Sequence, residues 1–169
     1  MKWIQREFPT DVPLWMAHNI IERLRGTPAR LEDRLSAVGP RALAHRVEDR
    51  WSILENLGHL IELEPLWYAR VEELAQGATE LTAADMTNQA TNAGAYNSQN
   101  LSELLSKFRL CREALIRALD DFPAEALGNR ALHSRLKQPM TVVDHLVFVA
   151  EHDDHHLATI SSLLKDTAE

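Results

Sequence analysis

The sequence predicts an all-α protein: an antiparallel four-helix bundle with a long crossover connection between the second and third helices. Apolar residues recur at helical spacing in four long segments. Three of these segments start at residues typical of helix N-caps. The polar, asparagine-rich residues 77–100 separate the second segment from the third and are long enough for a crossover. Because the chain has no internal repeat or break in composition, we expect residues 1–169 to form one domain.

Composition and charge narrow the class of protein. The formal net charge is −7, which argues against nucleic acid as a partner, because phosphate binding needs a basic face. No apolar run approaches the ~20 residues that span a bilayer, and the first residues lack the apolar core of a secretory signal. Cys111 is the single cysteine, so no disulfide can form within the chain. We therefore expect a cytoplasmic protein that acts on a small-molecule substrate.

The first helix is expected to begin near residues 11–13. The sequence Gly26-Thr27-Pro28 interrupts it, and a short second piece is expected from Pro28 to about Leu35. Thr27 as the cap and Pro28 at the first helical position fit such a restart.

The second helix begins with a capping box, Ser52-Ile53-Leu54-Glu55. In this motif the hydroxyl accepts a hydrogen bond from one free backbone N–H, and the glutamate accepts one from another. We expect the helix to continue to about Gln76 and to stop at Gly77.

The third helix is expected to start at Asn100, with Glu103 three residues later, and to end before Pro123 and Gly128. Its apolar stripe includes Cys111, which makes that thiol a poor candidate for a nucleophile.

The last part of the chain is expected to hold an irregular segment followed by the fourth helix. Residues 129–140 have no clear periodicity, and we expect a short extended pair between them and Val47–Trp51. Thr141 and Asp144 form a second box-like start. The fourth helix is then expected from about Val142 to Lys165.

Three histidines form the candidate metal site. His152 and His156 are four residues apart, so on a helix both imidazoles point the same way and can bind one ion. His59 lies at the edge of the apolar stripe of the second helix and supplies a third ligand. His155 falls on the opposite side of its helix, away from the stripe, and is expected to be solvated. Ordinary histidines at the edge of the core are the alternative interpretation.

Two other metal motifs fit less well. The sequence HDDHH has the spacing of a zinc-protease helix, but Asp153 replaces the glutamate base and points into the core. A di-iron bundle needs Glu-x-x-His on two helices, and this chain has no such pair. A single ion is the better prediction.

Several charged residues fall within apolar stripes. Asp153 must be paired, because a lone buried carboxylate costs several kcal/mol. We predict a buried ion pair between Arg112 and either Asp153 or Glu64. Glu62 lies one turn after His59 and is the candidate catalytic base, or else a partner that orients a metal ligand.

Two segments resemble the signature helices of the DinB-like superfamily, which includes YfiT-type proposed metal-dependent hydrolases and thiol-dependent transferases. They are WSILENLGHLIELE (51–64) and MTVVDHLVFVAEHDDHHLATI (140–160), with FRLCRE (108–113) and ALH (131–133) between them. The resemblance covers roughly residues 10–165. One departure is Thr159, where many relatives have glutamine.

The resemblance implies a four-helix bundle, often a homodimer. It also implies a divalent metal ion, zinc or nickel, bound by His59, His152 and His156. In some relatives a low-molecular-weight thiol is a cosubstrate. Three neutral imidazoles leave the +2 charge of such an ion uncancelled, so it can activate a water molecule or a thiol. The expected function is that of a metal-dependent hydrolase or thiol transferase; the alternative is a non-catalytic metal-binding module.

Overall fold

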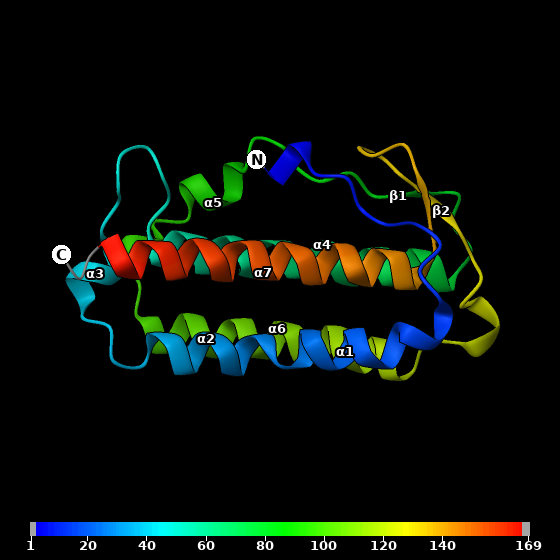
Figure 1. Ribbon diagram of the computed structural model, residues 1–169, viewed down its shortest axis with the longest axis horizontal. Helices are drawn as coiled ribbons and strands as arrows, with labels where there is room; N and C mark the ends of the chain where they lie inside the picture. The colour runs from blue at the N-terminus through cyan, green and yellow to red at the C-terminus, as the bar shows by residue number, and fades with distance from the viewer. Residues whose placement is uncertain (1–2, 167–169) are drawn as a thin grey trace.

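The computed structural model describes residues 3–166 and is a four-helix bundle with a small sheet at one end (Figure 1). Two successive helices, α1 (Ala17–Arg25) and α2 (Thr27–Leu35), form the first arm. The other arms are α4 (Ile53–Ala75), α6 (Leu101–Asp120) and α7 (Val142–Asp166). The predicted all-α bundle is confirmed.

Short elements connect or precede these arms. They are the 3-10 turns η1 (Trp3–Gln5), η2 (Leu14–Met16), η3 (Tyr96–Ser98) and η4 (Ala124–Ala126), and the helices α3 (Pro40–Ala44) and α5 (Gln89–Ala93). The crossover between α4 and α6 contains α5 and η3. Within residues 3–166, none of the helices combines the length and the apolar character needed to cross a membrane.

The crossover fixes the directions of the arms. α4 and α6 run parallel, because Leu57 packs in the same cluster as Phe108, and Leu74 in the same cluster as Leu119. The arm made of α1 and α2 runs the other way, together with α7 (Figure 1). The bundle is therefore antiparallel in the sense that two arms run in each direction.

Three helix starts follow the sequence. The Ser52 hydroxyl accepts from the backbone N–H of Glu55, whose carboxylate accepts from the backbone N–H of Ser52. Asn100 accepts from the first turn of α6 in the same way. Thr141 and Asp144 make the equivalent reciprocal pair at α7.

The predicted cap at Thr27 is wrong. Thr27 is the first residue inside α2, and the flanking Gly26 makes no side-chain cap. The chain keeps helical dihedral angles through Gly26, so Thr27 lies within the helix and cannot take the extended conformation of an N-cap. Its buried hydroxyl instead donates to Asp153 at 2.8 Å.

The predicted partner of the extended segment is also wrong. Strand β2 (Ala131–His133) pairs in parallel with β1 (Glu80–Leu81) and antiparallel with β3 (Pro139–Met140), whereas Val47–Trp51 is a loop. The parallel course of α4 and α6 explains this. β1 follows the end of α4 and β2 follows the end of α6, so both lie at the same end of the bundle, while Val47–Trp51 precedes the start of α4 at the other end (Figure 1).

The core consists of two apolar clusters with a polar layer between them. One cluster contains Trp67, Leu115 and Val149 at the sheet end, and the other contains Leu60, Phe108 and Leu157 at the opposite end. The polar layer is formed by four buried side chains that fall between these positions on their helices: Thr27, Glu64, Arg112 and Asp153. It crosses the middle of the bundle. One of its members, Asp153, directly follows His152 in the sequence.

Candidate metal centre

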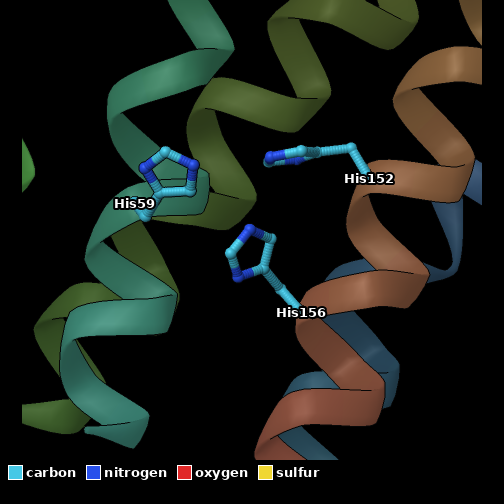
Figure 2. Close-up of side chains that lie close together, drawn as sticks. All are labelled: His59, His152 and His156. Atoms are coloured by element: carbon cyan, nitrogen blue, oxygen red, sulfur yellow. The ribbon is translucent and has the colours of Figure 1, made fainter. Parts of the chain in front are cut away.

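His59 from α4 and His152 and His156 from α7 converge on one point (Figure 2). Each offers one nitrogen, and these three atoms all lie within 4.8 Å of one another. The ring centroids are 5.3 Å apart for His59 and His152, 4.9 Å for His59 and His156, and 4.6 Å for the two α7 histidines. Nitrogens around a tetrahedral zinc ion lie about 3.3 Å apart, so small side-chain rotations would complete the coordination geometry.

Neighbouring polar groups fix which nitrogen of His156 is free. The Asn56 side-chain N–H₂ donates to the carbonyls of Trp51 and Ser52, so its Oδ1 is the atom that faces His156 Nδ1, at 2.8 Å. That oxygen can only accept, which places the proton on Nδ1 and leaves the lone pair on Nε2. Asn56 thus leaves His156 Nε2 free to bind a metal ion.

His59 has a similar partner in the crossover. Its Nδ1 lies 3.0 Å from the hydroxyl of Thr91, a buried residue of α5. An N–H donated to Thr91 would again leave Nε2 for a metal. Such hydrogen bonds from ligating histidines to protein groups are the usual way in which metal sites fix the imidazole orientation.

His152 carries the observation that fits an absent ligand. The residue is only 3% exposed, and its buried Nδ1 has no hydrogen-bond partner among residues 3–166. A buried polar atom without a partner calls for an explanation, and a metal ion bound by the three imidazoles would supply one. The donor set also suits zinc or nickel.

Burial keeps the three imidazoles neutral. It is the largest effect on each, and neighbouring histidines add to it; together they hold the pKa of His152 and His156 well below the usual range. Burial and the charge on His155 lower the pKa of His59 to about 4. Neutral imidazole is the form that binds metal, so no proton has to be displaced near neutral pH.

The histidines line a cavity of about 510 Å³. The N-terminal segment, the crossover and the small sheet lie along one side of α4 and α7 (Figure 1). Residues of all three contribute to the wall of the cavity. Its walls are largely aromatic, with a cationic region near β2. The other lining residues are Trp3, Trp51, Leu63, Trp67, Arg70, Ala83, Ala84, Asp85, Met86, Asn88, His133, Ser134, Arg135, Phe148 and His155.

The polar layer holds α7 in place beside this cavity. Arg112 donates to Asp153 at 2.6 and 3.1 Å and to Glu64 at 2.6 Å, so it pairs with both predicted partners at once. Burial disfavours its charge, yet Asp153 and Glu64 raise the pKa of the Arg112 guanidinium above its usual value. Burial also raises the pKa of Glu64, whereas the positive charge of Arg112 lowers it. Because Asp153 directly follows His152, this network fixes the position of the candidate ligands along the bundle axis.

Glu62 is not brought to the cavity. Its carboxylate accepts a hydrogen bond from the hydroxyl of Tyr96, and it is not among the residues that line the cavity. Its role as a base stays a prediction.

Cys111 and His155 were also placed by the sequence. Cys111 is half-buried on α6, away from the cavity, and burial raises the pKa of its thiol. The prediction that His155 is solvated, made from its side of the helix, is wrong. His155 is half-buried, lines the cavity and stacks on Trp3 with ring centroids 5.6 Å apart, because the N-terminal segment folds over α7.

Several residues of the site could not be found from local patterns. Trp3, Arg70 and Arg135 line the cavity from three separate elements, and Thr91 contacts His59 from the crossover. His133, Trp51 and Phe148 do stand in the segments that resemble the family, but the sequence assigned none of them to the site.

The comparisons with known proteins agree with this fold. YfiT from Bacillus subtilis, described as a probable metal-dependent hydrolase with an unusual four-helix bundle topology, superposes with a TM-score of 0.82 at 16% identity, over 96% of this chain and 94% of that one. A mycothiol-dependent maleylpyruvate isomerase gives a TM-score of 0.68 at 14% identity. That match covers 88% of this chain but 62% of the isomerase, so it leaves more than a third of the isomerase without a counterpart. No curated protein matches the sequence.

The sequence itself supplies the assignment to a family. The model of the DinB superfamily matches residues 23–160, a range that contains the whole of α4, α6 and the three histidines. The chain therefore belongs to the DinB superfamily.

Proposed function

We propose that His59, His152 and His156 bind one divalent metal ion, zinc or nickel, and that the protein is a metal-dependent enzyme acting on a small molecule. The observation that carries this proposal is the convergence of three neutral imidazoles, two of them oriented by hydrogen bonds, at the wall of a cavity of about 510 Å³. A metal that only linked two helices would need no such space beside it. A cavity of this size is typical of small-ligand sites.

The chemistry follows from the donor set. A divalent ion held by three uncharged ligands keeps its positive charge and lowers the pKa of a bound water or thiol, which supports either hydrolysis or thiol transfer. The chain's own thiol cannot take the second role, since Cys111 does not line the cavity. A transferase would therefore use an external low-molecular-weight thiol, as the name of the mycothiol-dependent structural relative indicates for that protein.

Metal content is the first test. The full chain, purified from cells grown with zinc or nickel, should contain about one ion per chain, and His152→Ala should lose most of it. His45→Ala is the matched control, because His45 is exposed and distant from the cluster. An equal metal content in His152→Ala and the wild type would refute the site.

Activity is the second test. The metal-loaded protein is assayed on esters, lactones and amides without a thiol, and on small electrophiles with glutathione, mycothiol or bacillithiol. Turnover that requires both metal and thiol identifies a transferase, whereas turnover that requires metal alone identifies a hydrolase. Stoichiometric metal binding without turnover in either screen would favour the non-catalytic module.

A further inference from the structure

The wall of the cavity near the sheet is cationic. Arg70 from the second half of α4 and His133, Ser134 and Arg135 from the end of β2 and the turn after it line this region. The single acidic residue among the lining residues is Asp85, and its carboxylate already accepts hydrogen bonds from the backbone N–H groups of Thr87 and Gln89. Two arginines and one acidic residue therefore line the cavity, and both arginines belong to this region.

Arg70 shows the imbalance most clearly. It is 1% exposed, and its guanidinium donates to the carbonyl of Thr82 at 2.7 and 2.9 Å. Its third contact is His133 Nε2, at 3.2 Å. Neither partner is negatively charged, and within residues 3–166 no ion pair forms at Arg70. Burial lowers the pKa of Arg70 to about 10, so the side chain is still charged at neutral pH. The charge of Glu73 favours the protonated form, but no carboxylate contacts the guanidinium. A buried charge without a directly paired counter-charge is costly.

His133 makes the missing group more specific. Its Nδ1 accepts hydrogen bonds from the backbone N–H groups of Arg135 and Leu136, both at 3.2 Å. Burial and the two arginines lower the pKa of His133 to about 4, so the ring is neutral at pH 7 and its single proton sits on Nε2. The Nε2–H of His133 and an N–H of Arg70 therefore face each other, and both lack an acceptor.

A third donor lies close by. The indole N–H of Trp67 is buried and has no acceptor among the described residues, and Trp67 also lines the cavity. Its ring lies 5.5 Å from the Arg70 guanidinium and 5.6 Å from the His152 ring. One aromatic side chain thus separates the cationic region from the candidate metal centre.

From this arrangement we infer that Arg70, Arg135 and His133 bind an anionic group of the substrate, a carboxylate, while the reacting part of the same molecule lies at the three histidines. An anion accepting from Arg70 and His133 satisfies both facing donors and neutralises the buried charge. Arg135 lies above the ring of Phe148, with its guanidinium carbon 6.0 Å from the ring centroid, and adds a second positive charge to the same wall. The assignment of this anion to a substrate rests on the proposed function, but the anion site itself does not.

The aromatic walls add a preference for a flat molecule. The ring centroid of Phe148 lies 5.1 Å from that of His133 and 5.9 Å from that of Trp67. The ring centroids of Trp3 and His152 are 5.1 Å apart. Aromatic rings therefore line the cavity between the arginines and the histidines. A small organic acid with a planar, conjugated body fits this lining better than a flexible aliphatic acid.

The probe for the experiment is benzoate, titrated calorimetrically into the full chain, with benzamide as its uncharged analogue. Benzoate should bind measurably and benzamide should bind at least about tenfold more weakly, the loss expected when a charge-assisted hydrogen bond is removed. Arg135→Gln and Arg70→Lys should each weaken benzoate binding by about tenfold or more. Arg117→Gln, which removes an exposed arginine on α6, should leave it unchanged.

Because carboxylates also bind metal ions directly, the titration is repeated with His152→Ala. Benzoate binding that survives in His152→Ala and falls in Arg135→Gln supports the inference. The reverse pattern, or equal binding of benzoate and benzamide, overturns it. Tighter binding of phenyl phosphate than of benzoate would overturn the choice of carboxylate. If Arg70→Lys fails to fold, Arg135→Gln alone decides. Failure of the metal-content test would remove the proposed function and leave these results standing.

Discussion

The hydrogen bond between Asn56 and His156 gives the sharpest prediction about metal affinity. In Asn56→Leu the side chain keeps a similar volume but loses the oxygen that accepts from His156 Nδ1 at 2.8 Å. Both residues are buried, so water cannot easily replace the lost acceptor. The imidazole would then be free to rotate or to move its proton to the nitrogen that should bind metal.

The expected size of the effect follows from this geometry. Loss of such an outer partner of a ligating histidine typically weakens metal binding by about 10–100-fold, or about 1.4–2.7 kcal/mol. The same substitution removes two hydrogen bonds from the Asn56 amide to the carbonyls of Trp51 and Ser52. At about 1 kcal/mol each, these should also lower the free energy of unfolding by about 2 kcal/mol.

Asn56→Asp separates the two effects. Its carboxylate still accepts from His156, so metal affinity should stay close to that of the wild type. It has no N–H to donate to the two carbonyls, so the protein should still be less stable than the wild type. Affinity is measured by competition with a chromophoric chelator, and stability by thermal unfolding of the metal-free protein. If Asn56→Leu bound metal as tightly as the wild type while remaining folded, the assignment of the His156 tautomer would be wrong.

Three other changes test the packing around the site by thermal or urea unfolding. Arg112→Met should destabilise the protein by about 3–5 kcal/mol, because it leaves the two carboxylates of the polar layer buried without their partner. Gly58→Ala should destabilise it and weaken metal binding, since an added Cβ would lie 2.4 Å from the Tyr96 ring and displace the crossover that holds one ligand. Lowering the pH from 7 to 4 should reduce the stability of the metal-free protein. Histidines whose pKa is depressed by folding contribute stability that is fully present above their unfolded pKa near 6.5 and is lost as the pH falls through the folded values.

The two substitutions have matched controls. Arg109→Met removes an exposed ion pair one turn earlier on the same helix and should cost no more than about 1 kcal/mol. Gly39→Ala adds a methyl group where nothing lies within 4 Å, so it should have little effect. A cost for Arg112→Met as small as that for Arg109→Met would contradict the account of the polar layer. A stability that is flat from pH 7 to pH 4 would contradict the account of the buried histidines.

Local patterns predicted the parts of the site that depend on neighbours along one helix. The spacing of His152 and His156 fixes their common direction, and the polar positions within apolar stripes required Arg112 to be paired. What escaped prediction depends on the course of the whole chain. The partner of β2 followed from the parallel course of two helices, and the cationic wall arises where Arg70 meets a strand about 60 residues later. No periodicity within one segment carries that information.

The histidines come from the long helices and part of the cavity wall comes from the connections, and this difference affects how the protein can change over evolutionary time. The three histidines sit on long helices clamped by the polar layer, whereas Ala83–Asn88 and Ser134–Arg135 of the cavity wall belong to connections. Connections tolerate replacement and changes of length far better than packed helices do. The wall of the cavity can therefore change residue by residue, and with it the molecules that fit inside, while the three histidines stay in place.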